Sequence, residues 1–150
     1  PQLASKKDQD FLWKNLKYID VVESDHAPHT KEEKESNNPP FGVPGLETTL
    51  PLLLTAVSEK RLTIDDIIRL CHKNPAKIFG IKTDPSTKII VDLNSSFIIH
   101  NSSLFTKCGW SPFVGMKAKG KIERVFIRGK KVFENGKILA KPGTGQIIKP

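Results

Sequence analysis

The sequence predicts an α/β fold for residues 1–82 and a β-rich segment for residues 83–150. Before residue 82, apolar residues recur with helical spacing in several segments and flank one short apolar run that is typical of a buried strand. After residue 82, apolar and polar residues alternate, and Asn135-Gly136 is typical of a β-hairpin turn. We therefore expect helices around a buried strand first, and strands of a small sheet after them.

The first expected element is a helix over residues 6–17. Ser5 and Asp8 have the spacing of a capping box, and the apolar residues that follow have helical spacing. The run YIDVV, residues 18–22, is short and apolar and ends in polar residues, which predicts a buried strand as in a parallel sheet. Helix, short link, strand and polar loop form the αβ unit of an α/β fold.

A long polar loop and a buried helix should follow. Residues 30–45 carry charge, asparagine, proline and glycine, and loops of this length inside compact domains are often functional. LETTLPLLLTAVSEK, residues 46–60, predicts a helix that is buried on a wide face. Pro51 should lie in or near its first turn, where a missing N–H is tolerated.

Two more helices are expected before the strands. Thr63 should begin the first, with Asp66 at the capping-box position. Pro75 should begin a second, short helix that ends at Gly80. The side chains of the first helix that should face inward are Ile64, Ile67, Ile68 and Cys71. The strands expected after residue 82 lie in residues 88–93, 96–100 and 122–140.

Composition excludes several classes of protein. The 150 residues suffice for one ordinary domain, and no apolar run approaches the roughly 20 residues of a membrane span. The two cysteines, Cys71 and Cys108, lie far apart without CxxC spacing, so we expect no disulfide framework, no cysteine zinc site and a reducing, cytoplasmic setting. The net charge is +8, but no basic block is interleaved with aromatic residues, so we expect no nucleic-acid partner.

The candidate site is VESDHAPHT, residues 22–30. Asp25 comes just after the predicted strand, and the active site of a parallel barrel lies at the carboxyl ends of its strands. Asp25 could bind a metal, accept a proton, or do both. An Asp-His pair also occurs as a hydrogen-bonded cluster in loops, because Asp and Ser readily cap turns. His26 and His29 flank Pro28, and their rings need not face the same way.

Several segments of the chain, in one order, resemble the dihydroorotases of the amidohydrolase superfamily. They are SDHAPHT, FGVPGLETTLPLLLTAV, HKNPAKIFGI, WSPFVGMKAKGKIERVFIRGKKVFENGKI and PGTGQ. The resemblance is strongest to the dihydroorotase domains of animal-type multifunctional proteins of pyrimidine synthesis. It implies that residues 1–82 form the last part of a metal-dependent (β/α)8 barrel, with the catalytic aspartate loop. Residues 83–150 would then form the C-terminal part of a small β-subdomain.

The resemblance also implies a reaction and roles for three residues. Dihydroorotases cyclise N-carbamoyl-L-aspartate to L-dihydroorotate, reversibly and with loss of water, at a zinc site in pyrimidine (UMP) biosynthesis. By resemblance, Asp25 would ligate zinc and act as the general acid and base. His29 would bind the substrate carboxylate through a charge-assisted hydrogen bond. Phe41 would contact substrate through its backbone; the family often has proline there, and a main-chain contact survives that difference.

The other polar and aromatic candidates are expected to be structural. His26 either orients Asp25 or is a packed, hydrogen-bonded loop histidine, and both interpretations stay open. Glu47 is expected to be structural, and it could orient the Asp25 loop. Asn74 should belong to a helix start. The remaining residues of this kind are His72 and His100, expected to be structural, and Trp13, Trp110 and Phe113, expected in the core or at a subdomain interface.

The resemblance does not extend to the metal ligands. The family supplies an HxH pair, a carboxylated lysine and two further histidines, and none of these is found in the sequence. Catalytic zinc needs about three protein ligands, and a complete barrel needs about 250 residues. We therefore expect this sequence to be the C-terminal portion of a longer enzyme, with most zinc ligands upstream. Alone, it should be inactive and should aggregate, oligomerise or fold partially.

Two alternatives and several partners follow from this interpretation. The chain could be a non-catalytic amidohydrolase-like interaction module, or a hydantoinase- or allantoinase-type cyclic amidohydrolase. His29 argues against the second, because those relatives usually lack a histidine there. The expected partners are a small-molecule substrate and, as a family property, a second copy of the polypeptide, with no membrane. The resemblance also favours fusion to other pyrimidine-pathway domains.

Overall fold

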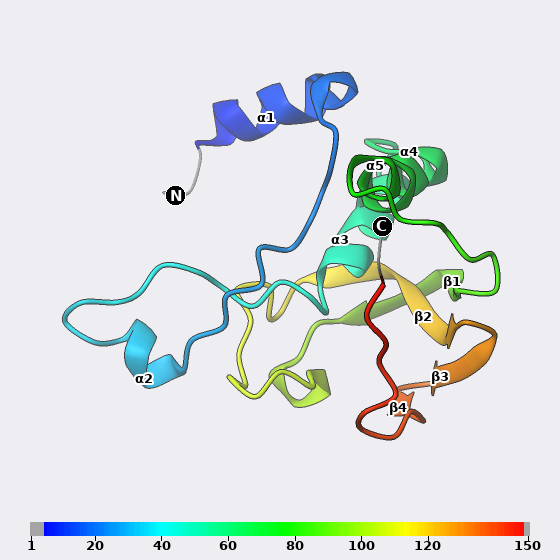
Figure 1. Cartoon of the computed structure of the whole chain (residues 1–150). Helices are drawn as coiled ribbons and strands as arrows, with labels where there is room; N and C mark the ends of the chain where they lie inside the picture. The colour runs from blue at the N-terminus through cyan, green and yellow to red at the C-terminus, as the bar shows by residue number, and fades with distance from the viewer. Residues whose placement is uncertain (1–4, 149–150) are drawn as a thin grey trace.

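Helices precede an antiparallel sheet along the chain, as the sequence predicts (Figure 1). The structure is a computed structural model and describes residues 5–148. The helical elements are α1 (Lys6–Lys14), η1 (Leu16–Tyr18), α2 (Lys31–Lys34), α3 (Thr49–Ser58), α4 (Ile64–Ile68), η2 (Arg69–Lys73), α5 (Asn74–Ile78) and η3 (Asn101–Ser103). The strands are β1 (Lys88–Ile98), β2 (Lys117–Ile127), β3 (Lys130–Glu134) and β4 (Lys137–Ile138). None of the helices in residues 5–148 has both the length and the apolar character needed to cross a membrane.

The strands form one four-stranded sheet in the order β1-β2-β3-β4, with every neighbouring pair antiparallel. The two strands expected in residues 88–100 are one long strand, β1, whose register is interrupted between Asp92 and Ser96. Here the Asp92 carboxylate accepts the N–H of Asn94 at 2.9 Å, so a local turn replaces ladder hydrogen bonds without ending the strand. The Asn135-Gly136 turn is confirmed, with φ of 47° and 83°.

The N-terminal part differs from the prediction in two respects. The Ser5–Asp8 capping box is confirmed, but α1 ends at Lys14 and a 3₁₀ turn follows it. The buried strand predicted for residues 18–22 is wrong, because these residues form no strand in the described chain and Tyr18 is 74% exposed. An apolar run becomes a strand only where a neighbouring strand accepts and donates its backbone hydrogen bonds. No strand of the described sheet pairs with this run.

The helices predicted at Thr63 and Pro75 are one continuous helical run. The Thr63–Asp66 capping box begins it, and a π-helical turn, η2, joins α4 to α5. In this turn Asn74 donates its N–H to the carbonyl of Arg69, five residues back. A wider turn accommodates Pro75, which has no N–H to donate and whose ring would clash with the preceding turn of an α-helix. The stop at Gly80 is confirmed, since it has a φ of 65°.

The inward face predicted for α4 is only partly correct. Ile67 is buried, but Ile64 and Ile68 are each 37% exposed and Cys71 is also exposed. The helical spacing is right, but the described residues include no element that covers this face. Other large apolar side chains are exposed as well, among them Phe79 at 63% and Phe105 at 55%. Exposed apolar area of this kind marks surfaces that are suited to association.

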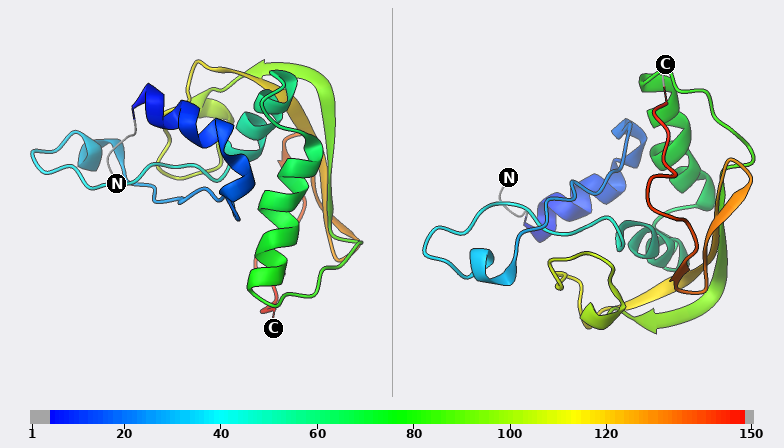
Figure 2. Two further views of the ribbon diagram at one scale, coloured as in Figure 1. Left: turned by 90° about the horizontal axis from the view of Figure 1, so that it is seen from above. Right: turned by 60° about the horizontal axis from the view of Figure 1, so that its bottom comes forward.

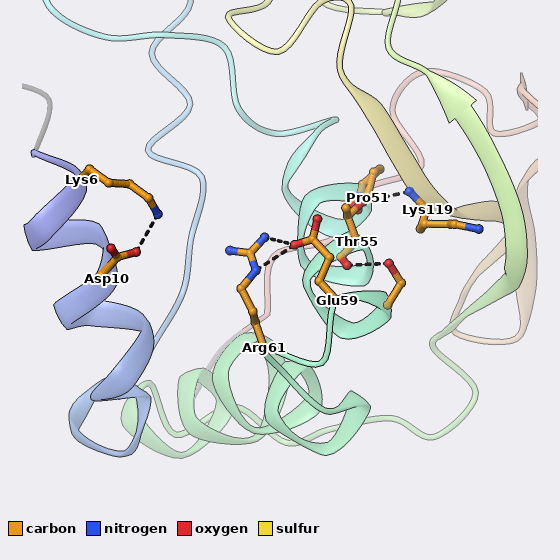
Figure 3. Close-up of polar contacts among 8 residues, drawn as sticks. Lys6, Asp10, Pro51, Thr55, Glu59, Arg61 and Lys119 are labelled. Atoms are coloured by element: carbon orange, nitrogen blue, oxygen red, sulfur yellow. Dashed lines mark hydrogen bonds and ion pairs between the residues drawn. The ribbon is translucent and has the colours of Figure 1, made fainter.

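Helix α3 packs on β2 (Figures 1 and 2), and the core extends from α3 to α4. Its cluster of buried side chains consists of Leu54, Ala56, Leu62 and Ile67. The Thr55 hydroxyl donates to the Pro51 carbonyl at 2.8 Å and accepts the N–H of Lys119 at 2.8 Å (Figure 3). Pro51 lies in the first turn of α3, as predicted. Helix α3 therefore joins the helical part of the chain to the sheet.

Removing the Asp66 carboxylate should destabilise the start of α4. The hydrogen bond from the Thr63 hydroxyl lowers the pKa of this carboxyl below its usual 3.8. A lowered pKa in the folded state stabilises the fold above the unfolded-state pKa, and this contribution is lost as the pH falls through the lowered value. We expect Asp66→Asn to cost about 1 kcal/mol at pH 7 and nothing well below pH 3.8. Thermal unfolding at several pH values measures this loss of stability. The control is Asp65→Asn, since Asp65 lies in the same turn but makes no cap, and its replacement should change the stability little.

Candidate functional site

Asp25 lies in an exposed turn with a strained backbone. Its φ is 40°, which is uncommon for residues other than glycine but tolerated by Asp and Asn. Its N–H donates to the Glu23 carboxylate at 2.6 Å. Within residues 5–148 the Asp25 carboxylate has no hydrogen-bond or ion-pair partner. The carboxylate is therefore available to a ligand or a reacting group.

The segment that leads into this turn is held by the helical run α4–η2–α5. The Arg69 guanidinium donates to the carbonyls of Leu16 and Ile19 at 3.4 and 3.2 Å. The guanidinium thus supplies hydrogen-bond donors to main-chain carbonyls that in a sheet would accept N–H groups of a neighbouring strand.

Asn74 makes a second attachment of the same kind. Its side-chain amide donates to the Asp20 carbonyl at 2.8 Å, and the Val22 N–H donates to the Leu70 carbonyl at 3.2 Å. Asn74 is thus inside a helical run and tethers the approach to Asp25, whereas the sequence predicted only a helix start.

His26 attaches the Asp25 turn to the 43–46 segment. Its Nδ1 accepts the N–H groups of Gly45 and Leu46, both at 3.2 Å, which places the proton of the neutral ring on Nε2. Residue 26 also forms a parallel β-bridge with Val43. Of the two interpretations of His26, the structure favours the packed, hydrogen-bonded loop histidine, because its contacts are to this segment and not to Asp25.

Two glycines permit this close approach. A Cβ at Gly45 would lie 2.6 Å from the Ser24 carbonyl oxygen, and one at Gly42 would lie 2.6 Å from the Ala27 Cβ. Gly42 also has a φ of 108°. Because real Cβ atoms do not approach so closely, only glycine fits at these two positions. The glycines of FGVPG thus explain how this segment reaches the SDHAPH turn.

His29 directly precedes Thr30, the N-cap of the short helix α2. The segment around α2 projects from the rest of the chain in Figures 1 and 2. The Nδ1 of His29 is 3.4 Å from the Glu33 carboxylate, and its side chain is 34% exposed. Its backbone carbonyl accepts the indole N–H of Trp110 at 2.7 Å. The sequence predicted a continuous loop from residue 30, but Thr30 and Glu33 form a capping box that begins α2.

Phe41 has a 79% exposed side chain, so it is not packed into the fold. The main chain on both sides of it is fixed by Lys34, whose Nζ donates to the Pro40 carbonyl at 2.6 Å and to the Gly42 carbonyl at 3.0 Å. Sequence reasoning missed Lys34, since nothing in the pattern distinguishes it from the other lysines of the loop.

Glu47 is structural, but its partner differs from the predicted one. Its carboxylate accepts the N–H groups of Phe105 and Thr106, each at 2.8 Å, and makes no bond to the Asp25 turn. The expectation that Glu47 orients that turn is therefore wrong. The two N–H groups lie 58 and 59 residues away in the sequence. No local sequence pattern around Glu47 could therefore have predicted these bonds.

The structure brings the two motif segments together but does not enclose them. A cavity of about 980 Å³ lies between the sheet and the motif segments and is lined by His26, Leu46 and Glu47. A second cavity, of about 550 Å³, lies over the sheet, and neither cavity is lined by Asp25, His29 or Phe41. No three side chains of His, Cys, Asp or Glu in residues 5–148 are grouped so that they could hold a metal. The described residues therefore do not build a zinc site by themselves.

Solved structures define the class of fold. The L-hydantoinase of Arthrobacter aurescens superposes with a TM-score of 0.92 at 31% identity, over 100% of this chain and 37% of that one. The inactive dihydroorotase-like domain of a CAD-like multifunctional protein from Chaetomium thermophilum superposes with a TM-score of 0.77 at 29% identity, over 95% and 41%. The chain has the fold of the corresponding part of an amidohydrolase, which confirms the predicted fold class.

The sequence is also similar to a multifunctional protein and to a dihydroorotase. The multifunctional protein CAD of Squalus acanthias is 50% identical over 149 residues, which are 99% of this chain and 7% of that protein. The dihydroorotase of Pyrococcus furiosus is 43% identical over 155 residues, which are 99% of this chain and 37% of that enzyme. The resemblance to dihydroorotases is confirmed, and the chain spans well under half of either relative. No protein-family model matches the chain.

Proposed function

We propose that this chain supplies the aspartate loop and the neighbouring substrate loop of a dihydroorotase. The main support for the proposal is a contact between the SDHAPH turn and residues 43–46, the VPGL segment: His26 of the turn accepts two N–H groups of that segment. These are the segments on which the resemblance rests. Their contact gives Asp25, His29 and Phe41 one connected scaffold.

In the proposed reaction Asp25 moves a proton. In the hydrolytic direction, water adds to the ring carbonyl of dihydroorotate, the C–N bond breaks, and carbamoyl aspartate is released. The Asp25 carboxylate takes a proton from the attacking water and returns it to the leaving ring nitrogen. His29 binds the substrate carboxylate, and the main chain at Phe41 contacts the substrate. The fixation of this main chain by Lys34 supports the last role.

The proposal includes a cofactor and further partners. Dihydroorotases and hydantoinases are generally metal-dependent, and we propose that Asp25 is the ligand this chain gives to a zinc site completed by residues outside it. We also propose that residues 1–82 and 83–150 belong to the barrel and the β-subdomain, and that other pyrimidine-pathway domains share the polypeptide. The multifunctional relative supports fusion, and self-association stays a prediction.

Substrate preference tests the proposed function. The native polypeptide should open dihydroorotate and close carbamoyl aspartate, and should leave hydantoin and allantoin unchanged. Turnover of the four compounds at equal concentration measures this. Turnover of hydantoin without dihydroorotate would assign the chain to the hydantoinase type and would refute the proposal.

A second candidate function is a non-catalytic, amidohydrolase-like module. The observation that favours it is the similarity to a Chaetomium thermophilum domain that is described as inactive. A native polypeptide that folds, binds no zinc and turns over none of the four compounds would establish this alternative.

Replacing His29 should weaken substrate binding more than it slows the reaction. If His29 binds the substrate carboxylate, His29→Ala removes a hydrogen bond to a charged group, which is worth about 1.5–3 kcal/mol. We expect the KM for dihydroorotate to rise by about 10- to 100-fold, with a smaller change in kcat. His72→Ala, an exposed histidine on the helical run, is the matched control and should leave both constants unchanged. An unchanged KM in His29→Ala would contradict this role.

A further inference from the structure

The loop of residues 104–111, between η3 and β2, contacts both halves of the candidate site. Glu47 accepts two N–H groups of this loop, at Phe105 and Thr106, and Trp110 donates its indole N–H to the His29 carbonyl. His29 and Trp110 are 81 residues apart in the sequence. The loop thus reaches from Glu47, directly after the VPGL segment, to the turn that carries His29.

The loop contacts residues 44–48, and both segments also line the cavity of about 980 Å³. Side chains of both segments, together with His26, surround a void of only about 10 Å³. A void of this size is at the lower limit for a single water molecule. Thr48 and Ser111 are both buried in this region, at 4% and 8% exposure. The loop is therefore fixed on one side before it reaches His29.

Trp110 is suited to hold a backbone carbonyl in place. Its indole N–H is a donor only, and the bond to the His29 carbonyl, at 2.7 Å, is short and partly buried. The projecting segment around α2 buries no side chain of its own helix. The bonds of Lys34 to residues 40 and 42, and of His26 to residues 45 and 46, all lie within residues 26–46. The bond from Trp110 joins this segment to a distant part of the chain. The side-chain contact of His29 with Glu33 is local to the same segment and cannot fix its position relative to the rest of the fold.

We propose that Trp110 is a positioning residue, which fixes the backbone at His29 and thereby the site for the substrate carboxylate. This inference rests on the proposed function, in which His29 binds that carboxylate. Trp110 itself does not touch the substrate. Its effect is to keep the imidazole of His29 at a set distance from Asp25, so that the carboxylate and the reacting ring of one substrate are held together.

The variant Trp110→Phe in the native polypeptide tests the proposal, because it removes the indole N–H and keeps an aromatic ring. We expect the KM for dihydroorotate to rise about tenfold, which corresponds to about 1.4 kcal/mol, with kcat lowered less than threefold. Inhibition by orotate, which carries the same carboxylate, should weaken by about the same factor. The control is Trp13→Phe, since Trp13 packs under Arg61 and against the core cluster and should change neither value. A purely structural loss would lower the active fraction and kcat without raising KM.

A second readout separates failure of this inference from failure of the proposed function. Amide hydrogen exchange of residues 27–34 should be several-fold faster in Trp110→Phe than in the wild type or in Trp13→Phe. If the wild type turns over dihydroorotate but Trp110→Phe has an unchanged KM, the inference is overturned and the proposed function stands. If the wild type has no dihydroorotase activity, the proposed function fails. Faster exchange then still supports positioning of His29 by Trp110, and unchanged exchange overturns it.

Discussion

The variant Asp25→Asn is expected to lose dihydroorotase activity while keeping the fold. An amide cannot take a proton from the attacking water and return it to the ring nitrogen, so we expect kcat to fall by about 10²–10⁴-fold. Asn tolerates a positive φ as well as Asp does, so the turn with φ of 40° should persist. Initial rates in both directions, with circular dichroism of the variant, measure this.

The matched control for this variant is Asp20→Asn. Asp20 lies five residues upstream, and only its backbone carbonyl takes part in the attachment to Asn74. We expect full activity from this control. Activity within threefold of wild type in Asp25→Asn would show that the proton is moved by another group.

The largest expected loss of stability comes from Gly120→Ala. An added Cβ would lie 2.6 Å from Leu54 Cδ1 and 2.8 Å from Leu54 Cβ, and the backbone has a φ of 81°. Strand β2 and helix α3 would have to move apart at the core, and overpacking of this kind costs about 1–3 kcal/mol beyond the cost of the backbone conformation. For a domain of this size, the unfolding midpoint should fall by roughly 5–10 °C.

Gly115→Ala isolates the packing part of this effect. Gly115 has nearly the same φ, 85°, but a Cβ there would meet no atom within 4 Å. Gly115→Ala should therefore lose only the stability that the positive φ costs a residue with a Cβ. The difference between the unfolding midpoints of the two variants then gives the cost of the clash. Equal midpoints would mean that β2 does not approach α3 as closely as the structure has it.

Local patterns in the sequence predicted local structure well. Three predicted features depend only on residues within a few positions of one another, and all three are confirmed. They are the Ser5–Asp8 and Thr63–Asp66 capping boxes and the Asn135-Gly136 turn. The order of helices before strands followed from spacing patterns, and the amidohydrolase fold followed from the resemblance of whole segments, which the comparisons confirm.

Features that depend on distant partners were not predicted. The run 18–22 has the composition of a strand, but its backbone bonds to Arg69 and Leu70 instead of to a neighbouring strand. The bond from Trp110 to the His29 carbonyl joins residues 81 positions apart, and no local pattern encodes it. The roles of Asp25, His29 and Phe41 came from resemblance and stay proposals.

The most direct test of the central claim is the zinc content of the native polypeptide, measured together with its intact mass. The claim is that Asp25 acts with metal ligands that residues 5–148 do not contain. We expect zinc to copurify with a polypeptide well above 16.7 kDa that turns over dihydroorotate, and removal of zinc by a chelator to abolish turnover. Turnover of dihydroorotate by a zinc-free polypeptide of 16.7 kDa would contradict the claim.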